Sequence, residues 1–220
     1  MKNKIKHSLV LICIILILFA CAPKPEQVIK QEKLSLLEKE LDLWKSFKIT
    51  GILDAQYQAF TLRNSCVIQK NDDKFRADVL SSGLFGLGGG IMMAAYIDRD
   101  KMQLRRPGSQ TIEDVPFDTD TQAGIKFVTD ELFVRLESEK NIIAETNKTE
   151  IEGFEIFFTP LMRLSEIRNR EENLRITLNY DRQENLIEIN AFVPSIRRLT
   201  IHIDKIEHAD IMISELRKIE

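Results

Sequence analysis

Few side chains in this 220-residue sequence have the type and spacing that catalysis or metal binding requires. Neither His202 nor His208 has a second histidine at a metal-ligand spacing, so solvated histidines are the preferred interpretation and metal ligands the alternative. Several carboxylates lie in mixed-charge surroundings typical of a solvated surface, among them Glu137, Glu139, Glu171 and Glu172. We therefore expect no catalytic residues and no metal site from these groups.

The sequence also lacks the common motifs of enzymes and nucleotide-binding proteins. It contains no Gly-x-Ser-x-Gly, no phosphate loop and no Cys-x-x-Cys. The run Gly88-Gly89-Gly90 is not followed by the Lys and the Ser or Thr that a phosphate loop needs. We expect neither enzymatic activity nor a cofactor.

The three cysteines have three different expected fates. Cys13 lies within an N-terminal apolar run that is predicted to be removed, and Cys21 stands directly after this run. Cys66 then has no disulfide partner, although the expected compartment would permit a disulfide. Its place between Ser65 and Val67 in a predicted strand indicates a buried small apolar side chain, a reactive thiol being the alternative.

The N-terminus has the layout of an export signal. Three lysines precede the uncharged run Leu9–Ala20, which is shorter than the roughly 20 residues of a membrane-spanning helix. The run ends in Leu18-Phe19-Ala20-Cys21, which resembles the lipobox of bacterial lipoproteins, with Phe19 larger than the residue usual at its place. The resemblance implies cleavage before Cys21 and a diacylglyceryl thioether on its sulfur. An uncleaved anchor helix and ordinary secretion are the alternatives.

A lipidated Cys21 would attach the mature chain to a membrane, because two or more acyl chains hold a protein there stably. Ala22 and Pro23 follow the cysteine, and neither is the Asp that retains lipoproteins in the inner membrane of enteric bacteria. We expect a lipid-anchored protein on the inner leaflet of the outer membrane, facing the periplasm. The inner membrane is the alternative.

The mature chain is acidic. The full sequence has 31 Lys+Arg and 34 Asp+Glu, and removal of Lys2, Lys4 and Lys6 leaves 28 basic residues against 34 acidic ones, a net charge of −6. An acidic total without a dense basic stretch argues against a nucleic-acid partner.

Four parts follow along the chain: a signal peptide (1–20), a lipidated tether (21–27), an N-terminal helix (28–46) and a β-rich domain (47–220). The helix is predicted from apolar residues at helical spacing, which are Leu34, Leu37, Leu41 and Trp44. We expect this stripe to pack on a sheet, with the binding of a partner as the alternative.

From residue 47 the apolar residues recur with a period of two, which predicts antiparallel strands with one face in water. Later strands are predicted at Ile142-Ile143 and in the ranges 151–158, 174–180, 186–193 and 199–203. The range 161–170 is ambiguous, and the total is nine to eleven strands. Residues 118–138 interrupt this series with a helix so apolar that it must cover something.

The predicted fold is mainly β (α+β): an open, strongly curved antiparallel sheet, or half-barrel, closed by a central lid helix and preceded by an amphipathic helix. Sheet and lid would enclose an apolar hollow, although side chains that fill it are the alternative. The predicted lining and lid residues are Phe47, Ile49, Phe60, Leu62, Phe75, Val79, Ile125, Val128, Leu132 and Leu136.

This order of elements resembles the LolA/LolB superfamily of lipoprotein-localisation proteins, from about Leu43 to about Ile213. The resemblance is carried by three segments and the glycine loop after the second one: Trp44-Lys45-Ser46-Phe47-Lys48-Ile49-Thr50-Gly51, Phe75-Arg76-Ala77-Asp78-Val79-Leu80 and Leu199-Thr200-Ile201-His202-Ile203. It implies an open barrel with helical lid elements that binds lipoprotein acyl chains. A lipidated Cys21 favours the membrane-tethered, LolB-like member over a soluble carrier.

The glycine loop, Gly83-Leu84-Phe85-Gly86-Leu87-Gly88-Gly89-Gly90, sets large apolar side chains among flexible glycines. In LolB-like proteins the corresponding loop projects an apolar residue that helps insert cargo into the membrane. The resemblance implies this role for Leu84, supported by Phe85 and Leu87, although the loop is longer and richer in glycine than usual. The alternative is a bulged hairpin folded inward.

Two hypotheses for function follow. The first is a receptor that takes lipoproteins from a LolA-like periplasmic carrier, holds their acyl chains in the hollow and delivers them to the membrane. The second is a lipoprotein of the same fold that serves as a scaffold or complex subunit. Binding of another hydrophobic ligand is a third possibility.

Overall fold

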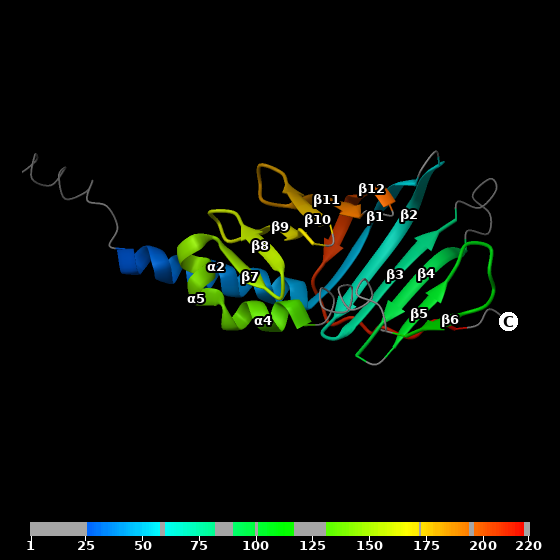
Figure 1. Cartoon of the computed structure of the whole chain (residues 1–220), viewed down its shortest axis with the longest axis horizontal. Coiled ribbons are helices and arrows are strands. Elements are labelled where there is room, and N and C mark those ends of the chain that lie inside the picture. Colours follow the sequence, from blue (N-terminus) through cyan, green and yellow to red (C-terminus); the bar gives the residue numbers. More distant parts are fainter. Residues whose placement is uncertain are drawn as a thin grey trace, which may run out of the picture.

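The computed structural model describes residues 26–57, 60–81, 90–99, 101–116, 131–171, 173–193 and 196–217. These residues form twelve strands and three helices (Figure 1). The strands are β1 (Ser46–Tyr57), β2 (Phe60–Asn71), β3 (Lys74–Leu80), β4 (Ile91–Ile97), β5 (Met102–Arg105), β6 (Glu113–Val115), β7 (Lys148–Ile151), β8 (Phe154–Phe158), β9 (Leu164–Asn169), β10 (Leu174–Tyr180), β11 (Leu186–Val193) and β12 (Ile196–Glu207). The helices are α2 (Glu26–Lys45), α4 (Leu132–Ser138) and α5 (Lys140–Thr146).

All twelve strands belong to one open antiparallel sheet. Its order, β6-β5-β4-β3-β2-β1-β12-β11-β10-β9-β8-β7, consists of two meanders that meet where β1 pairs with β12. The chain passes from β6 at one edge to β7 at the other edge through residues 116–147, whose described part contains α4 and α5. The predicted fold, an open curved antiparallel sheet with an N-terminal helix, is confirmed (Figure 1).

The two faces of the sheet follow from the strand registers, because side chains alternate between faces along each strand. We call the face that carries Phe47, Ile49 and Val79 the inner face and the opposite one the outer face. Helix α2 lies over the inner face, since Trp44 packs against apolar residues of β1. The predicted apolar stripe of this helix is confirmed as a packing surface, because Leu37 and Leu41 are buried in the core.

Two strand predictions were wrong. Ile142 and Ile143 belong to helix α5, in which Ile143 is fully buried and Ile142 is half exposed. Isoleucine is β-branched and favours strands, but Ile143 of α5 is buried in the same core as Leu132 and Leu136 of α4. Of the helix expected at 118–138, α4 covers the last seven residues, and 118–130 lie outside the described residues. The prediction of one strand over 151–158 was wrong as well, because Glu152 and Gly153 form a turn between β7 and β8. Strand β6 was not predicted, and β9 lies in the range that the sequence left ambiguous.

The C-terminal segment, residues 209–217, crosses the outer face of the N-terminal meander. Arg76 Nη1 donates to the carbonyl oxygen of Ser214 at 3.0 Å, and Asn71 Nδ2 donates to that of Ile211 at 2.8 Å. Ile213 and Leu216 pack on Ala94 and Tyr96 of β4 in a separate small core. The outer face of this half is therefore covered by the chain's own last described residues.

Gly51 allows the two meanders to approach each other closely. The register between β1 and β12 shifts between Thr50 and Gly51, and a Cβ on Gly51 would lie 2.1 Å from the carbonyl oxygen of His202. The carbonyl oxygen of His202 belongs to the backbone of β12. It therefore cannot move away without disturbing the pairing of β12 with β1.

We expect Gly51→Ala to lower the free energy of unfolding by about 1–3 kcal/mol, as overpacking of a close-packed site does. The matched control is Gly90→Ala, because a Cβ on Gly90 meets nothing within 4 Å. Urea denaturation followed by circular dichroism measures both variants. Equal stability of the two would contradict this account of the centre of the sheet.

Candidate functional site

The inner face carries a continuous cluster of apolar side chains across β12, β1, β2 and β3. Its buried members are Phe47, Ile49, Leu53, Cys66, Val79 and Ile201. The half-buried residues packed against them come from the strands, including Met92 and Met93 of β4, and from Trp44 of α2. Among the described residues, α4 and α5 contribute nothing to this cluster, which we call the strand cluster.

A second and larger core lies under the helices. It joins Leu37 and Leu41 of α2, Leu132 and Leu136 of α4, and Ile143 of α5 to the strands β7 to β11. Trp44 touches both cores, since it stacks on Phe133 of α4 and meets the ring of Phe47 edge-on. The described helices therefore cover the C-terminal meander.

The residues predicted to line the hollow fall into three groups. Phe47, Ile49 and Val79 lie together in the strand cluster, and Leu62 and Phe75 are half-buried. Leu132 and Leu136 are fully buried, but in the core under the helices rather than against Phe47 and Ile49. The side chain of Phe60, the predicted lid residues Ile125 and Val128, the loop residues Leu84, Phe85 and Leu87, and Cys21 lie outside the described residues.

Ser81, shortly before the glycine loop, pairs with Gly90, the last residue of the loop. The Ser81 amide donates to the carbonyl oxygen of Gly90 at 2.9 Å, which continues the pairing of β3 with β4 beyond Leu80 and Ile91. The loop therefore connects two adjacent antiparallel strands, as expected from the sequence.

Cys66 is buried within the strand cluster, and the expectation of a buried small side chain is confirmed. Burial raises the pKa of its thiol, and the carboxylate of Asp204 raises this pKa further. Both effects disfavour the reactive thiolate. Cys66 thus contributes apolar surface to the inner face.

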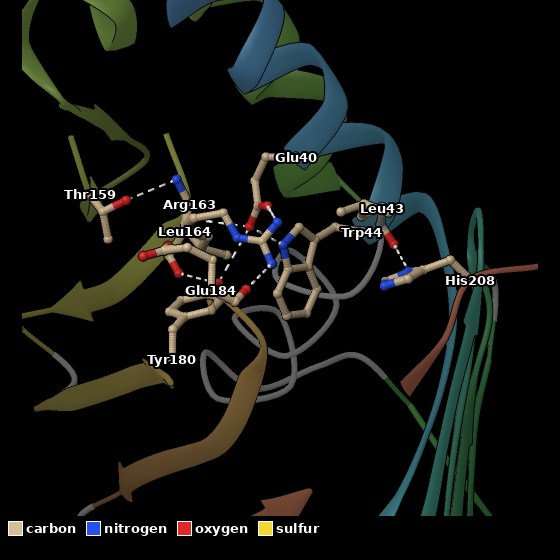
Figure 2. Close-up of polar contacts among 9 residues, drawn as sticks. All are labelled: Glu40, Leu43, Trp44, Thr159, Arg163, Leu164, Tyr180, Glu184 and His208. Carbon is tan, nitrogen blue, oxygen red and sulfur yellow. Dashed lines mark hydrogen bonds and ion pairs between the residues drawn. The ribbon is translucent and has the colours of Figure 1, made fainter. Parts of the chain in front are cut away.

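A buried polar cluster fixes α2 to the sheet beside these apolar residues (Figure 2). It consists of Glu40, Trp44, Arg163, Leu164 and Tyr180, and we call it the Glu40 cluster. The Glu40 carboxylate accepts hydrogen bonds from Trp44 Nε1 at 2.8 Å and from the Leu164 amide at 3.0 Å. Its other oxygen pairs with Arg163 Nη1 at 2.9 Å, and the Glu40 side chain is only 2% exposed. One carboxylate therefore joins α2 to β9.

Tyr180 of β10 completes the cluster. Its hydroxyl donates to the carbonyl oxygen of Leu164 at 2.7 Å, and the Arg163 guanidinium lies over its ring at 5.0 Å. Burial, with the negative charge of Glu40 second, raises the pKa of this hydroxyl, so Tyr180 remains a neutral donor. Glu40 was not among the predicted residues, although it stands three residues after Leu37 on the stripe that packs inward; this position indicates that Glu40 is buried but does not identify its partners.

The histidines have ordinary polar partners. His202 Nδ1 lies 3.2 Å from the Glu188 carboxylate on the outer face, and His208 Nδ1 lies 3.0 Å from the carbonyl oxygen of Leu43. Among the described residues, no three His, Cys, Asp or Glu side chains are placed to hold a metal ion. In the same part of the chain, no helix combines the length and the apolar character needed to cross a membrane.

No family model and no curated protein sequence matches this chain. Several solved structures are similar to it, among them the following three. A putative outer membrane lipoprotein-sorting protein domain from Vibrio parahaemolyticus has a TM-score of 0.42 and 6% identity, over 81% of this chain and 92% of its own. A LolA superfamily protein from Nitrosomonas europaea has a TM-score of 0.36 and 8% identity, over 81% of this chain and 94% of its own. The Mycobacterium tuberculosis lipoprotein LppX has a TM-score of 0.34 and 7% identity, over 86% of this chain and 100% of its own. At such low similarity, these structures assign no function to this chain.

We expect Glu40→Ala to lower the free energy of unfolding by about 3–5 kcal/mol, because it leaves buried donors and the Arg163 charge without their partner. The matched control is Glu38→Ala on the same helix. Glu38 pairs with Lys140 at 2.6 Å, but both side chains are exposed, and such a pair contributes only about 0.2–1 kcal/mol. Chemical denaturation measures both. Comparable losses for the two variants would show that the Glu40 cluster is not a structural attachment.

Proposed function

We propose that this protein is an outer-membrane lipoprotein that binds the acyl chains of lipoproteins on the inner face of its sheet and helps insert them into the membrane. The observation that carries the proposal is the strand cluster. It presents apolar side chains across adjacent strands, and among the described residues Trp44 is its one helical contribution.

Such a face suits an acyl chain for physical reasons. Each methylene that leaves water contributes about 0.8 kcal/mol, and the interaction has no directional requirement. Met92 and Met93 at the rim of the cluster are flexible and polarisable, so they can adapt to chains of different length. Transfer onward needs no energy source if the bilayer holds the acyl chains better than the inner face does.

The remaining parts of the proposal come from the sequence. The lipobox implies an anchor on Cys21, and the residues after it favour the outer membrane. A LolA-like periplasmic carrier would supply the cargo, and the glycine loop would contact the bilayer through Leu84, Phe85 and Leu87. The role is one of binding and transfer, without enzymatic chemistry.

Exchange of the anchor residue tests the attachment. We expect Cys21→Ser to abolish incorporation of radiolabelled palmitate, because the thioether needs the sulfur. Cys13→Ser is the matched control, since this cysteine lies in the predicted signal peptide. Palmitate incorporation into the Cys21→Ser chain would refute the lipobox assignment.

Exchange of the loop residue tests the transfer step. We expect Leu84→Glu to leave lipoproteins in the periplasm or the inner membrane, because a charged tip does not enter the apolar bilayer. The control is Met212→Glu, which changes an equally apolar residue that is 96% exposed on the C-terminal segment. Membrane fractionation of a reporter lipoprotein gives the readout. Normal sorting with Leu84→Glu would defeat the proposed receptor function.

One observation favours the scaffold alternative. Ile187 and Phe192 of β11 are 46% and 51% exposed, and exposed apolar residues of this kind can contact a protein partner. Deletion of the N-terminal helix does not separate the two hypotheses, because Leu37 and Glu40 of α2 are part of the fold. A scaffold would instead lose its partner upon Phe192→Glu, whereas a receptor would continue to sort lipoproteins.

A further inference from the structure

The proposed function requires the lipid on Cys21 and the glycine loop to reach the same membrane. Cys21 is followed by four residues before α2 begins at Glu26. Five fully extended residue steps span at most about 18 Å. The first turn of α2 is therefore held close to the bilayer surface, whatever path these residues take.

The ends of β3 and β4, which the glycine loop connects, lie far from the start of α2 (Figure 1). Figure 1 shows the start of α2 at one end of the long axis of the molecule and the ends of β3 and β4, which the loop connects, toward the other. Helix α2 has 20 residues and is therefore about 30 Å long. If α2 stood upright on the membrane, the connection between β3 and β4 would be held at least this far above the surface. The lipid on Cys21 and the glycine loop can contact the same membrane only when the long axis of the molecule lies along the membrane surface.

Helix α2 has an apolar stripe that is suited to this orientation. Ile29 and Leu36 are 43% and 39% exposed and stand seven residues apart, two helical turns, on one side of the helix. The stripe borders the face that packs into the domain, since Glu40, one turn after Leu36, is buried against β9. Lys39 is exposed one turn after Leu36, where its long side chain can reach lipid headgroups.

We propose that the stripe formed by Ile29 and Leu36 lies on the lipid bilayer and holds the protein flat, so that the end of the sheet with the glycine loop faces the membrane. The inference rests on the proposed function, because it takes the anchor on Cys21 as given. Without the anchor, two apolar side chains would attach the protein only weakly to the bilayer. The anchor makes the contact intramolecular, and the high effective concentration then compensates for this weakness.

The test measures the depth of single fluorescent labels in vesicles of phosphatidylethanolamine and phosphatidylglycerol. The full lipidated chain carries Cys66→Ala and one further cysteine, Ile29→Cys, Leu36→Cys or Gln31→Cys, labelled with a nitrobenzoxadiazole dye. Gln31 is exposed on another side of α2 and is the matched control. We expect lipids with a nitroxide in the acyl chain to quench labels at 29 and 36 several-fold more than the label at 31. Equal quenching at all three positions would overturn the proposal.

A second measurement reports the orientation of the sheet. A label on Gly90→Cys, beside the glycine loop, should be quenched by nitroxide headgroups, and the double variant Ile29→Gln/Leu36→Gln should remove most of this quenching. Retained quenching in the double variant would overturn the proposal.

The two proposals can fail separately. If labels at 29 and 36 enter the bilayer while Leu84→Glu sorts lipoproteins normally, the orientation stands and the receptor function fails. If Leu84→Glu blocks sorting while both labels remain in water, the function stands and the orientation is wrong.

Discussion

The apolar inner face of a single open sheet has to leave water, and it does so differently in the two halves of the molecule. Over β7 to β11, the helices α2, α4 and α5 form a packed core with fully buried residues such as Leu37, Leu136 and Ile143. Over β12 and β1 to β3, the described apolar side chains pack mainly against one another. This division separates a part that holds the fold together from a part that is suited to an apolar ligand.

The Glu40 cluster connects these two parts. Its buried carboxylate holds α2 against β9, and the aromatic ring of Trp44 four residues later extends from the helical core to Phe47 of the strand cluster. Displacement of α2 would leave this buried charge unpaired, which is strongly destabilising. The direction of α2 relative to the sheet is thereby fixed. In a lipid-anchored protein, this direction determines how the sheet faces its membrane.

Much of the fold was accessible from the sequence because its patterns are strong. The period-two segments around Phe47, Ile49 and Val79 form strands with these residues buried, and the stripe of α2 packs inward through Leu37 and Leu41. The strand preference of isoleucine gave a wrong prediction at Ile142-Ile143. These residues are helical, and Ile143 is buried in the same core as Leu136. The Glu40 cluster could not be predicted, because its members are brought together only by the packing of α2 on β9 and β10. Of the predicted lid, the described residues Leu132 and Leu136 belong to the core under the helices.

The most direct test of the central claim is mass spectrometry of the hydrophobic material that leaves with the native protein, compared with a variant whose inner face is filled. Ala95 of β4 lies half-buried on this face, opposite Ala77 and Leu104, so the ring of Ala95→Trp would take the space that the account assigns to an acyl chain. Ser65→Trp places the same side chain on the exposed outer face of β2 as a control. The account predicts bound acyl lipid on the native chain and on Ser65→Trp, and its loss from a stable Ala95→Trp chain. A native chain without lipid, together with an Ala95→Trp chain that unfolds because no room exists for the ring, would contradict it.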